Sequence, residues 1–178
     1  MSRQLAIRWL PLWLFCASVV AVAGDRSGSI DGGAEAAPLQ LENLRGEQHS
    51  LSEFRGNVVL VNFWTSWCPP CISEMPALKR LSRAMADRPF ALLAVNVAEG
   101  RGIVQRFSAL EEAGIRLLRD VDGKVAKGWG VEVYPTSVIV DGLGRRHETI
   151  IGETDWDAQE HYDRLETLIR ATTAIPGD

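Results

Sequence analysis

The chain has 178 residues, of which 46% are hydrophobic and 24% are charged, and its formal net charge is −4 at pH 7. A chain of this length can bury one proper hydrophobic core. Its basic residues are dispersed and form no basic-aromatic stripe, so we expect no nucleic-acid partner. The mild acidity indicates mainly solubility.

Residues 1–23 have the features of a targeting signal. Arg3 and Arg8 form a basic region, and residues 9–23 are almost wholly apolar and end in a small-x-small site before Gly24. This apolar run is shorter than the roughly 20 residues that a membrane-spanning helix needs. We therefore expect a cleaved signal peptide, with a retained anchor that tethers the chain through residues 9–23 as the alternative. Either reading predicts a periplasmic or other extracytoplasmic protein.

Removal of this signal would leave a single pair of thiols. Cys16 lies inside the signal, and the other two cysteines are Cys68 and Cys71. A disulfide across so short a loop would contribute only roughly 2 kcal/mol to stability in the chain-entropy model. The pair is therefore better interpreted as functional than as a structural staple.

The rest of the chain divides into a linker, one domain and a tail. Residues 24–37 are polar and glycine-rich without periodicity, which predicts a flexible linker. Residues 38–172 show strands that alternate with helices, followed by a terminal hairpin and helix, and this order is typical of an α/β sandwich with a mixed central sheet. Residues 173–178 form the tail. The strands are expected at 39–42, 48–51, 57–64, 90–97, 116–118, 136–140 and 145–151, and the helical segments at 50–54, 69–87 (kinked at Pro76), 103–113, 125–128 and 155–172.

The motif Trp67-Cys68-Pro69-Pro70-Cys71 lies where the predicted strand 57–64 gives way to the helix that begins at residue 69. The helix dipole and the free backbone N–H groups at such a point stabilise a thiolate, so this Cys-x-x-Cys is interpreted as a redox centre that needs no other cofactor. Cys68, at the helix start, is expected to be exposed and to attack a substrate disulfide. Cys71, one turn inside the helix and more buried, would then resolve the mixed disulfide.

A zinc site is the competing interpretation of this cysteine pair. It would need two further ligands. The three histidines, His49, His147 and His161, are not paired at ligand spacing. We therefore expect no metal.

The chain resembles the thioredoxin fold, and specifically the exported TlpA/ResA-like thiol-disulfide oxidoreductases, over about residues 38–169. The resemblance implies a three-layer α/β/α sandwich with an N-terminal β-hairpin extension and a central α-helical insertion. It is carried by residues 61–71, by Glu74-Met75-Pro76, by Tyr134-Pro135-Thr136, and by Asn96-Val97 with the segment 103–114 after it.

Glu74 is the third catalytic candidate. It lies three residues after Cys71 and so on nearly the same helix face, where a partly buried carboxylate could exchange a proton with that thiol. The alternative is an ordinary exposed helix glutamate. The resemblance favours the catalytic role, because the family carries an active-site glutamate at this offset. Cytoplasmic thioredoxins instead hold a buried aspartate at the position of Asn62.

The resemblance also implies a docking surface for the substrate. Pro135 would be a cis-proline facing the disulfide, although it could also simply begin a strand. The backbone of Tyr134 would pair with the substrate chain as an added strand. Trp67 would flank the cysteines, and Pro69 and Pro70 would tune the electrostatics of the helix terminus and hence the redox poise.

These features together predict an enzyme that reduces protein disulfides. The resemblance suggests apocytochrome c haem-site cysteines or oxidase copper-site cysteines as substrates, and a membrane thiol carrier as the electron donor. We expect a monomer.

Three other functions fit the sequence less well. A DsbA-like oxidase would carry a larger helical insertion than residues 103–114. A Cu(I) chaperone of this fold usually has three residues between its cysteines and a nearby histidine. A peroxidase would need a peroxidatic cysteine beside a threonine and an arginine, so antioxidant activity is not expected.

Overall fold

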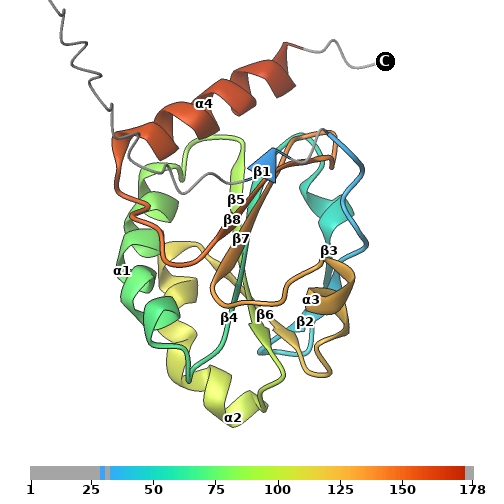
Figure 1. Cartoon of the computed structure of the whole chain (residues 1–178), viewed down its shortest axis with the longest axis vertical. Coiled ribbons are helices and arrows are strands. Elements are labelled where there is room, and N and C mark those ends of the chain that lie inside the picture. The colour runs from blue at the N-terminus through green and yellow to red at the C-terminus, as the bar shows by residue number, and fades with distance from the viewer. Residues whose placement is uncertain (1–28, 31–32, 175–178) are drawn as a thin grey trace, which may run out of the picture.

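The computed structural model describes residues 29–30 and 33–174 of the chain. The predicted signal, residues 1–23, and most of the predicted tail lie outside the described residues. A central sheet with helices on both of its faces forms a three-layer α/β/α sandwich (Figure 1). The predicted fold class is therefore confirmed.

The sheet is mixed and has the strand order β1-β8-β7-β4-β5-β6-β2-β3. Its centre is parallel, and the strands on either side of the centre run antiparallel. Every residue of β4 is buried, as expected for a strand that is covered on both faces. The central strands are β4 (Val58–Trp64), β5 (Phe90–Val97), β6 (Arg116–Asp120), β7 (Thr136–Val140) and β8 (Arg146–Ile151).

The N-terminal part of the domain adds strands at both edges of the sheet. The predicted hairpin is present as β2 (Gln40–Asn43) and β3 (Gln48–Ser50), and β2 pairs with β6. At the other edge, β1 (Ser29–Ile30) pairs with β8, and Glu35 forms a bridge with Arg145. These parts of the predicted linker, 24–37, therefore pair with the domain instead of standing apart from it.

Helices on the two faces bury separate hydrophobic cores. One face is covered by α1 (Pro69–Ala84), α2 (Arg101–Val104), η2 (Gln105–Ala113) and α4 (Gln159–Thr173). The opposite face is covered by the shorter η1 (Leu51–Phe54) and α3 (Lys124–Gly128). Figure 1 shows α1 and α3 on opposite sides of the strands. Both cysteines of the motif belong to the core beneath α1.

Two predicted helices differ in form. The segment 103–113 is one α-helical turn followed by a 3₁₀ helix, and it ends at Gly114, whose φ of 81° is the left-handed conformation that favours glycine. The last helix begins at Gln159 rather than near residue 155. Residues 152–158 instead form an irregular connection, because the backbone N–H of Thr154 is engaged by Glu74 and the Trp156 side chain is fully buried.

Candidate active site

The motif lies at the junction between β4 and α1, as predicted. Cys68 is the N-cap of α1, and its Sγ accepts the backbone N–H of Cys71 at 3.3 Å. Pro69 and Pro70 occupy the first turn, where a helix needs no donor N–H. Cys68 and Cys71 are joined by a disulfide, with their Cα atoms 5.3 Å apart. The positive end of the helix dipole therefore points at the sulfur of Cys68.

Both sulfur-bearing side chains are buried, which corrects one prediction. Cys71 is the more buried of the two, as expected, with 1% exposure. Cys68, which was expected to be exposed, is only 5% exposed. The reason is that its side chain turns back toward the helix to bond Cys71 and packs into the core beneath α1. Trp67, immediately before it, is 68% exposed.

Glu74 is buried beside this junction, so its alternative as an exposed helix residue is wrong. Its side chain is 2% exposed, and its carboxyl oxygens accept hydrogen bonds from Asn62 Nδ2 at 2.7 Å and from the Thr154 N–H at 3.2 Å. Burial raises the pKa of Glu74 to about 7, although these hydrogen bonds partly oppose the shift. A carboxyl with a pKa close to neutral can both take up and release a proton near pH 7.

Asn62 holds this carboxyl from β4. Its buried amide donates to Glu74 Oε1 and, at 3.0 Å, to the hydroxyl of Ser137 on β7. An amide cannot take part in proton exchange as a carboxyl does. Asn62 therefore orients the Glu74 carboxyl and cannot itself exchange a proton.

The predicted docking residues lie next to the motif. The Tyr134–Pro135 peptide bond is cis, as the resemblance implied. It directly precedes β7, whose first residue, Thr136, pairs with Phe63 near the end of β4. The rings of Trp67 and Tyr134 meet edge to face, with their centroids 6.0 Å apart. The structure thus brings Trp67, Tyr134 and Pro135 to the end of the sheet where the cysteines lie.

One buried acid near the motif was not predicted. Glu99, after β5, accepts hydrogen bonds from the Ser66 N–H at 2.7 Å, from the Ser66 hydroxyl at 2.5 Å and from Asn96 Nδ2 at 2.7 Å. Burial alone would raise the pKa of Glu99, but these hydrogen bonds lower it overall. The positive φ of Ala98, 57°, marks the turn that brings this carboxylate back to the loop before Cys68. In the sequence Glu99 looks like a polar loop residue, and no sequence signal indicates its contact with Ser66.

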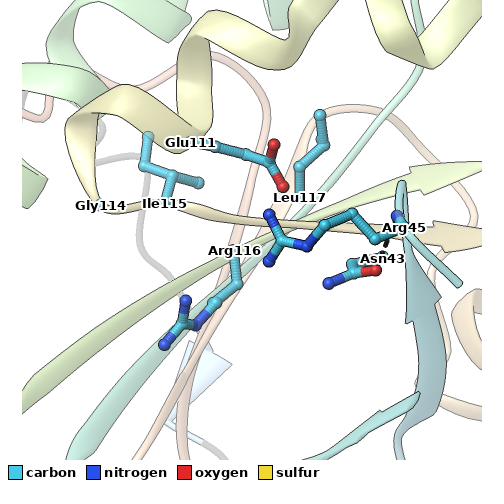
Figure 2. A pocket seen from close by; sticks show the side chains of 7 residues that line it. All are labelled: Asn43, Arg45, Glu111, Gly114, Ile115, Arg116 and Leu117. Atoms are coloured by element: carbon cyan, nitrogen blue, oxygen red, sulfur yellow. Dashed lines mark hydrogen bonds between the residues drawn. The ribbon is translucent and has the colours of Figure 1, made fainter. Parts of the chain in front are cut away.

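Among the described residues, no group of three or more histidine, cysteine or acidic side chains could hold a metal ion. A small pocket of about 140 Å³ lies between the β2–β3 hairpin, η2 and β6. In Figure 2 the Arg45 guanidinium and the Glu111 carboxylate approach each other across this pocket. No residue of the motif lines the pocket. Within the described part of the chain, no helix is long and apolar enough to span a membrane.

Comparisons with known proteins agree with this geometry. Residues 33–149 match the model of the AhpC/TSA family. The chain is 31% identical over 134 residues to the thiol-disulfide oxidoreductase ResA of Geobacillus thermodenitrificans, covering 75% of this chain and 77% of that protein. Two solved structures are similar. A Chlorobium tepidum protein provisionally identified as the thiol:disulfide interchange protein DsbE is 28% identical, with a TM-score of 0.67, and the match covers 81% of this chain and 99% of that one. The exposed lipoprotein thioredoxin Etrx1 of Streptococcus pneumoniae is 26% identical, with a TM-score of 0.61 and coverage of 74% and 100%.

Glu74→Gln should make stability less dependent on pH. Below a pH of about 4.5 the carboxyl is protonated in both the folded and the unfolded chain. As the pH rises toward about 7, the unfolded chain ionises Glu74 while the folded chain does not, and stability falls. A rise from 4.5 to about 7 corresponds to roughly 3 kcal/mol. Denaturant unfolding across this pH range should therefore show the variant gaining up to that amount relative to the wild type, and a constant difference would contradict the assigned burial.

Glu99→Gln should loosen the loop before Cys68. Three donors share the two carboxylate oxygens of Glu99, and glutamine turns one of these acceptors into a donor. Losing a hydrogen bond to a charged group costs about 1.5–3 kcal/mol, so amide exchange at Ser66 should accelerate about tenfold or more. Hydrogen exchange followed by NMR measures this. The control is Glu112→Gln, because Glu112 is exposed. Equal exchange rates at Ser66 in both variants would show that Glu99 does not hold this loop.

Proposed function

We propose that this chain, which belongs to the AhpC/TSA family and is a thiol-disulfide oxidoreductase with a thioredoxin-like fold, serves as a dedicated reductant of protein disulfides outside the cytoplasm. One observation carries the proposal. The Cys68–Cys71 disulfide lies at the N-terminus of α1, next to a buried glutamate whose pKa is about 7.

The first step is assigned to Cys68. In the reduced enzyme its thiolate is stabilised by the N-terminus of α1 and attacks one sulfur of a substrate disulfide. A new bond forms between Cys68 and that sulfur, the substrate S–S bond breaks, and the second substrate sulfur leaves as a thiolate. The product is a mixed disulfide.

The second step is assigned to Cys71 and Glu74. The Glu74 carboxylate takes the proton of the Cys71 thiol, and the resulting thiolate attacks the Cys68 sulfur. The mixed disulfide breaks, and the remaining substrate sulfur leaves as a thiolate that is then protonated. The substrate has gained two electrons, and the enzyme holds the Cys68–Cys71 disulfide. A membrane thiol carrier would reduce this disulfide again.

Substrate docking is assigned to residues around the motif: Trp67, which is exposed, Tyr134, which is half-buried, and Pro135, which is buried. Trp67 and Tyr134 form an aromatic pair at this end of the molecule, and Pro135 precedes β7 there. An extended substrate segment would pair with the backbone of Tyr134 as an added strand. Pro69 and Pro70 fill the first turn of α1 between the two cysteines and would contribute to the redox poise.

The substrate class and the location rest on sequence features and likeness. The resemblance to TlpA/ResA-like proteins favours apocytochrome c haem-site cysteines or oxidase copper-site cysteines as substrates. The apolar residues 9–23 support export, with cleavage of the signal or retention as a tether. The name of the similar pneumococcal protein, an exposed lipoprotein, points to the same side of the membrane. We propose that the domain acts as a monomer.

The substrate should be trapped by Cys71→Ser. Without Cys71 the mixed disulfide on Cys68 cannot be resolved, so the partner stays covalently bound. The full chain is expressed in its native host, and adducts that disappear on reduction are identified by mass spectrometry. The double variant Cys68→Ser/Cys71→Ser gives the background. Cytochrome c polypeptides or copper-oxidase subunits in the trap would support the proposal, whereas the absence of any Cys68-dependent adduct would sink it.

Glu74→Gln should also change the kinetics of disulfide reduction. In the wild type, the rate of resolution should rise with pH through an inflection near the Glu74 pKa of about 7. Loss of a general base costs about 100-fold or more. The variant should therefore be slower by that factor near neutral pH and should lose the inflection. Stopped-flow reduction of a peptide disulfide measures both quantities, and an unchanged pH–rate profile would rule out Glu74 as the proton acceptor.

A further inference from the structure

The irregular connection between β8 and α4, residues 152–158, is fastened along helix α1. The Ser73 hydroxyl donates to the Glu153 carboxylate, and the Thr154 N–H donates to Glu74 at 3.2 Å. Two turns further along α1, Arg80 Nε donates to both carboxylate oxygens of Asp157, at 2.9 and 3.1 Å. The connection therefore lies directly against the helix that carries Cys71 and Glu74.

The same connection is also bonded to Pro135, the cis-proline of the proposed docking surface. The N–H of Gly152 donates to the carbonyl of Pro135 at 2.8 Å. Residues 152–158 thus run from the cis-proline, past the buried glutamate, to the outer part of α1. From the sequence, residues 155–158 are expected to belong to the last helix, and no role is predicted for Trp156.

Trp156 is the one residue of the connection that enters the core. It is fully buried in the same cluster as Cys68 and Cys71. Its indole N–H is buried and has no hydrogen-bond partner among the described residues. An indole nitrogen can only donate, so a buried indole N–H without an acceptor is unfavourable unless an acceptor becomes available.

Glu74 is the acceptor within reach of this indole. The Trp156 N–H interacts with the Glu74 carboxyl strongly enough to lower its pKa, although the geometry falls short of a regular hydrogen bond. A carboxylate can accept two or three hydrogen bonds, and Asn62 and Thr154 supply two. Ionisation of Glu74 would strengthen its attraction for the third donor.

We propose that Trp156 is a positioning residue: the connection 152–158 holds it against Glu74, where its indole N–H completes the hydrogen bonding of the ionised carboxylate. This inference rests on the proposed role of Glu74 as the proton acceptor of Cys71. It adds a third hydrogen-bond donor, the Trp156 indole N–H, which would bond Glu74 only while that carboxyl is ionised.

Few other charged groups affect this carboxyl. Glu153, on the connection, raises the pKa of Glu74 by like-charge repulsion. His161, on α4, packs on the Trp156 ring with centroids 4.9 Å apart, and burial lowers the pKa of this histidine, which keeps it neutral near pH 7. Cys71, on α1, titrates only when the disulfide is reduced. Asn62 and Ser137, on the strands, carry no charge.

The test follows the titration of Glu74 in the full domain. In Trp156→Phe a smaller aromatic ring remains and the donor is lost, so the pKa of Glu74, read from its carboxyl ¹³C signal, should rise above about 7. The inflection of the pH–rate profile should move up with it. Trp129→Phe is the matched control, because Trp129 is also buried but lies in the core on the opposite face of the sheet. An unchanged Glu74 titration in Trp156→Phe, or equal shifts in both variants, would overturn the inference.

A second measurement needs no substitution at Trp156. In the wild-type protein, the indole ¹H–¹⁵N signal of Trp156 should move with the same apparent pKa as Glu74, and Glu74→Gln should abolish that movement. A Trp156 signal that ignores the Glu74 titration would also overturn the inference. The two proposals fail separately: if Glu74→Gln leaves the pH–rate profile unchanged, the role of Glu74 as proton acceptor fails, while the coupled titrations still report on Trp156.

Discussion

The burial of a carboxyl group in the protein interior is the constraint on which the site depends. An isolated buried carboxylate is highly unfavourable, so Glu74 requires either a proton or hydrogen bonds in place of water. The structure supplies those bonds from separate elements: Asn62 on β4 and Thr154 from the connection before α4. These two hydrogen bonds satisfy only part of what a buried carboxylate needs, so burial still raises the pKa of Glu74 to about 7. The junction of sheet and helix thus carries, close to the cysteine pair, a carboxyl that can take up or release a proton near pH 7.

Position relative to one helix favours the charged form of Cys68 and the neutral form of Glu74. Cys68 caps the N-terminus of α1, where free N–H groups and the helix dipole favour the anion. Glu74 lies further along the same helix, where burial favours the neutral form. Because Cys68 caps α1 and Glu74 lies within it, their separation is set by the first turns of that helix. The two successive attacks that we propose would use a thiolate at the N-terminal end of α1 and a proton acceptor further along the helix.

Much of this arrangement could be predicted from the sequence, because local patterns determine it. The apolar run of β4, the proline pair and the spacing from Cys71 to Glu74 each indicate a position on one strand or one helix. What could not be predicted depends on contacts between distant segments. Glu99 reaches the loop before Cys68 from beyond β5, and Trp156 reaches Glu74 from the connection before α4. Nothing near either residue in the sequence indicates its partner. The exposure of Cys68 was misjudged for the same reason, because core packing and the bond to Cys71, not helix position, bury its side chain.

The connection from Gly152 to Asp157 links the proposed docking residues to the buried carboxyl of Glu74. Trp67 of the aromatic pair is 68% exposed and Tyr134 is half-buried, and we propose that a partner protein docks there, whereas the Glu74 carboxyl is buried. Gly152 is bonded to Pro135 of the proposed docking surface, and Thr154 is bonded to Glu74. A substrate strand added beside Tyr134, as we propose, would therefore lie next to the segment that carries one donor of the buried carboxyl, Thr154. The docking and the proton transfer that we propose would thus be connected through the short backbone segment from Gly152 to Thr154.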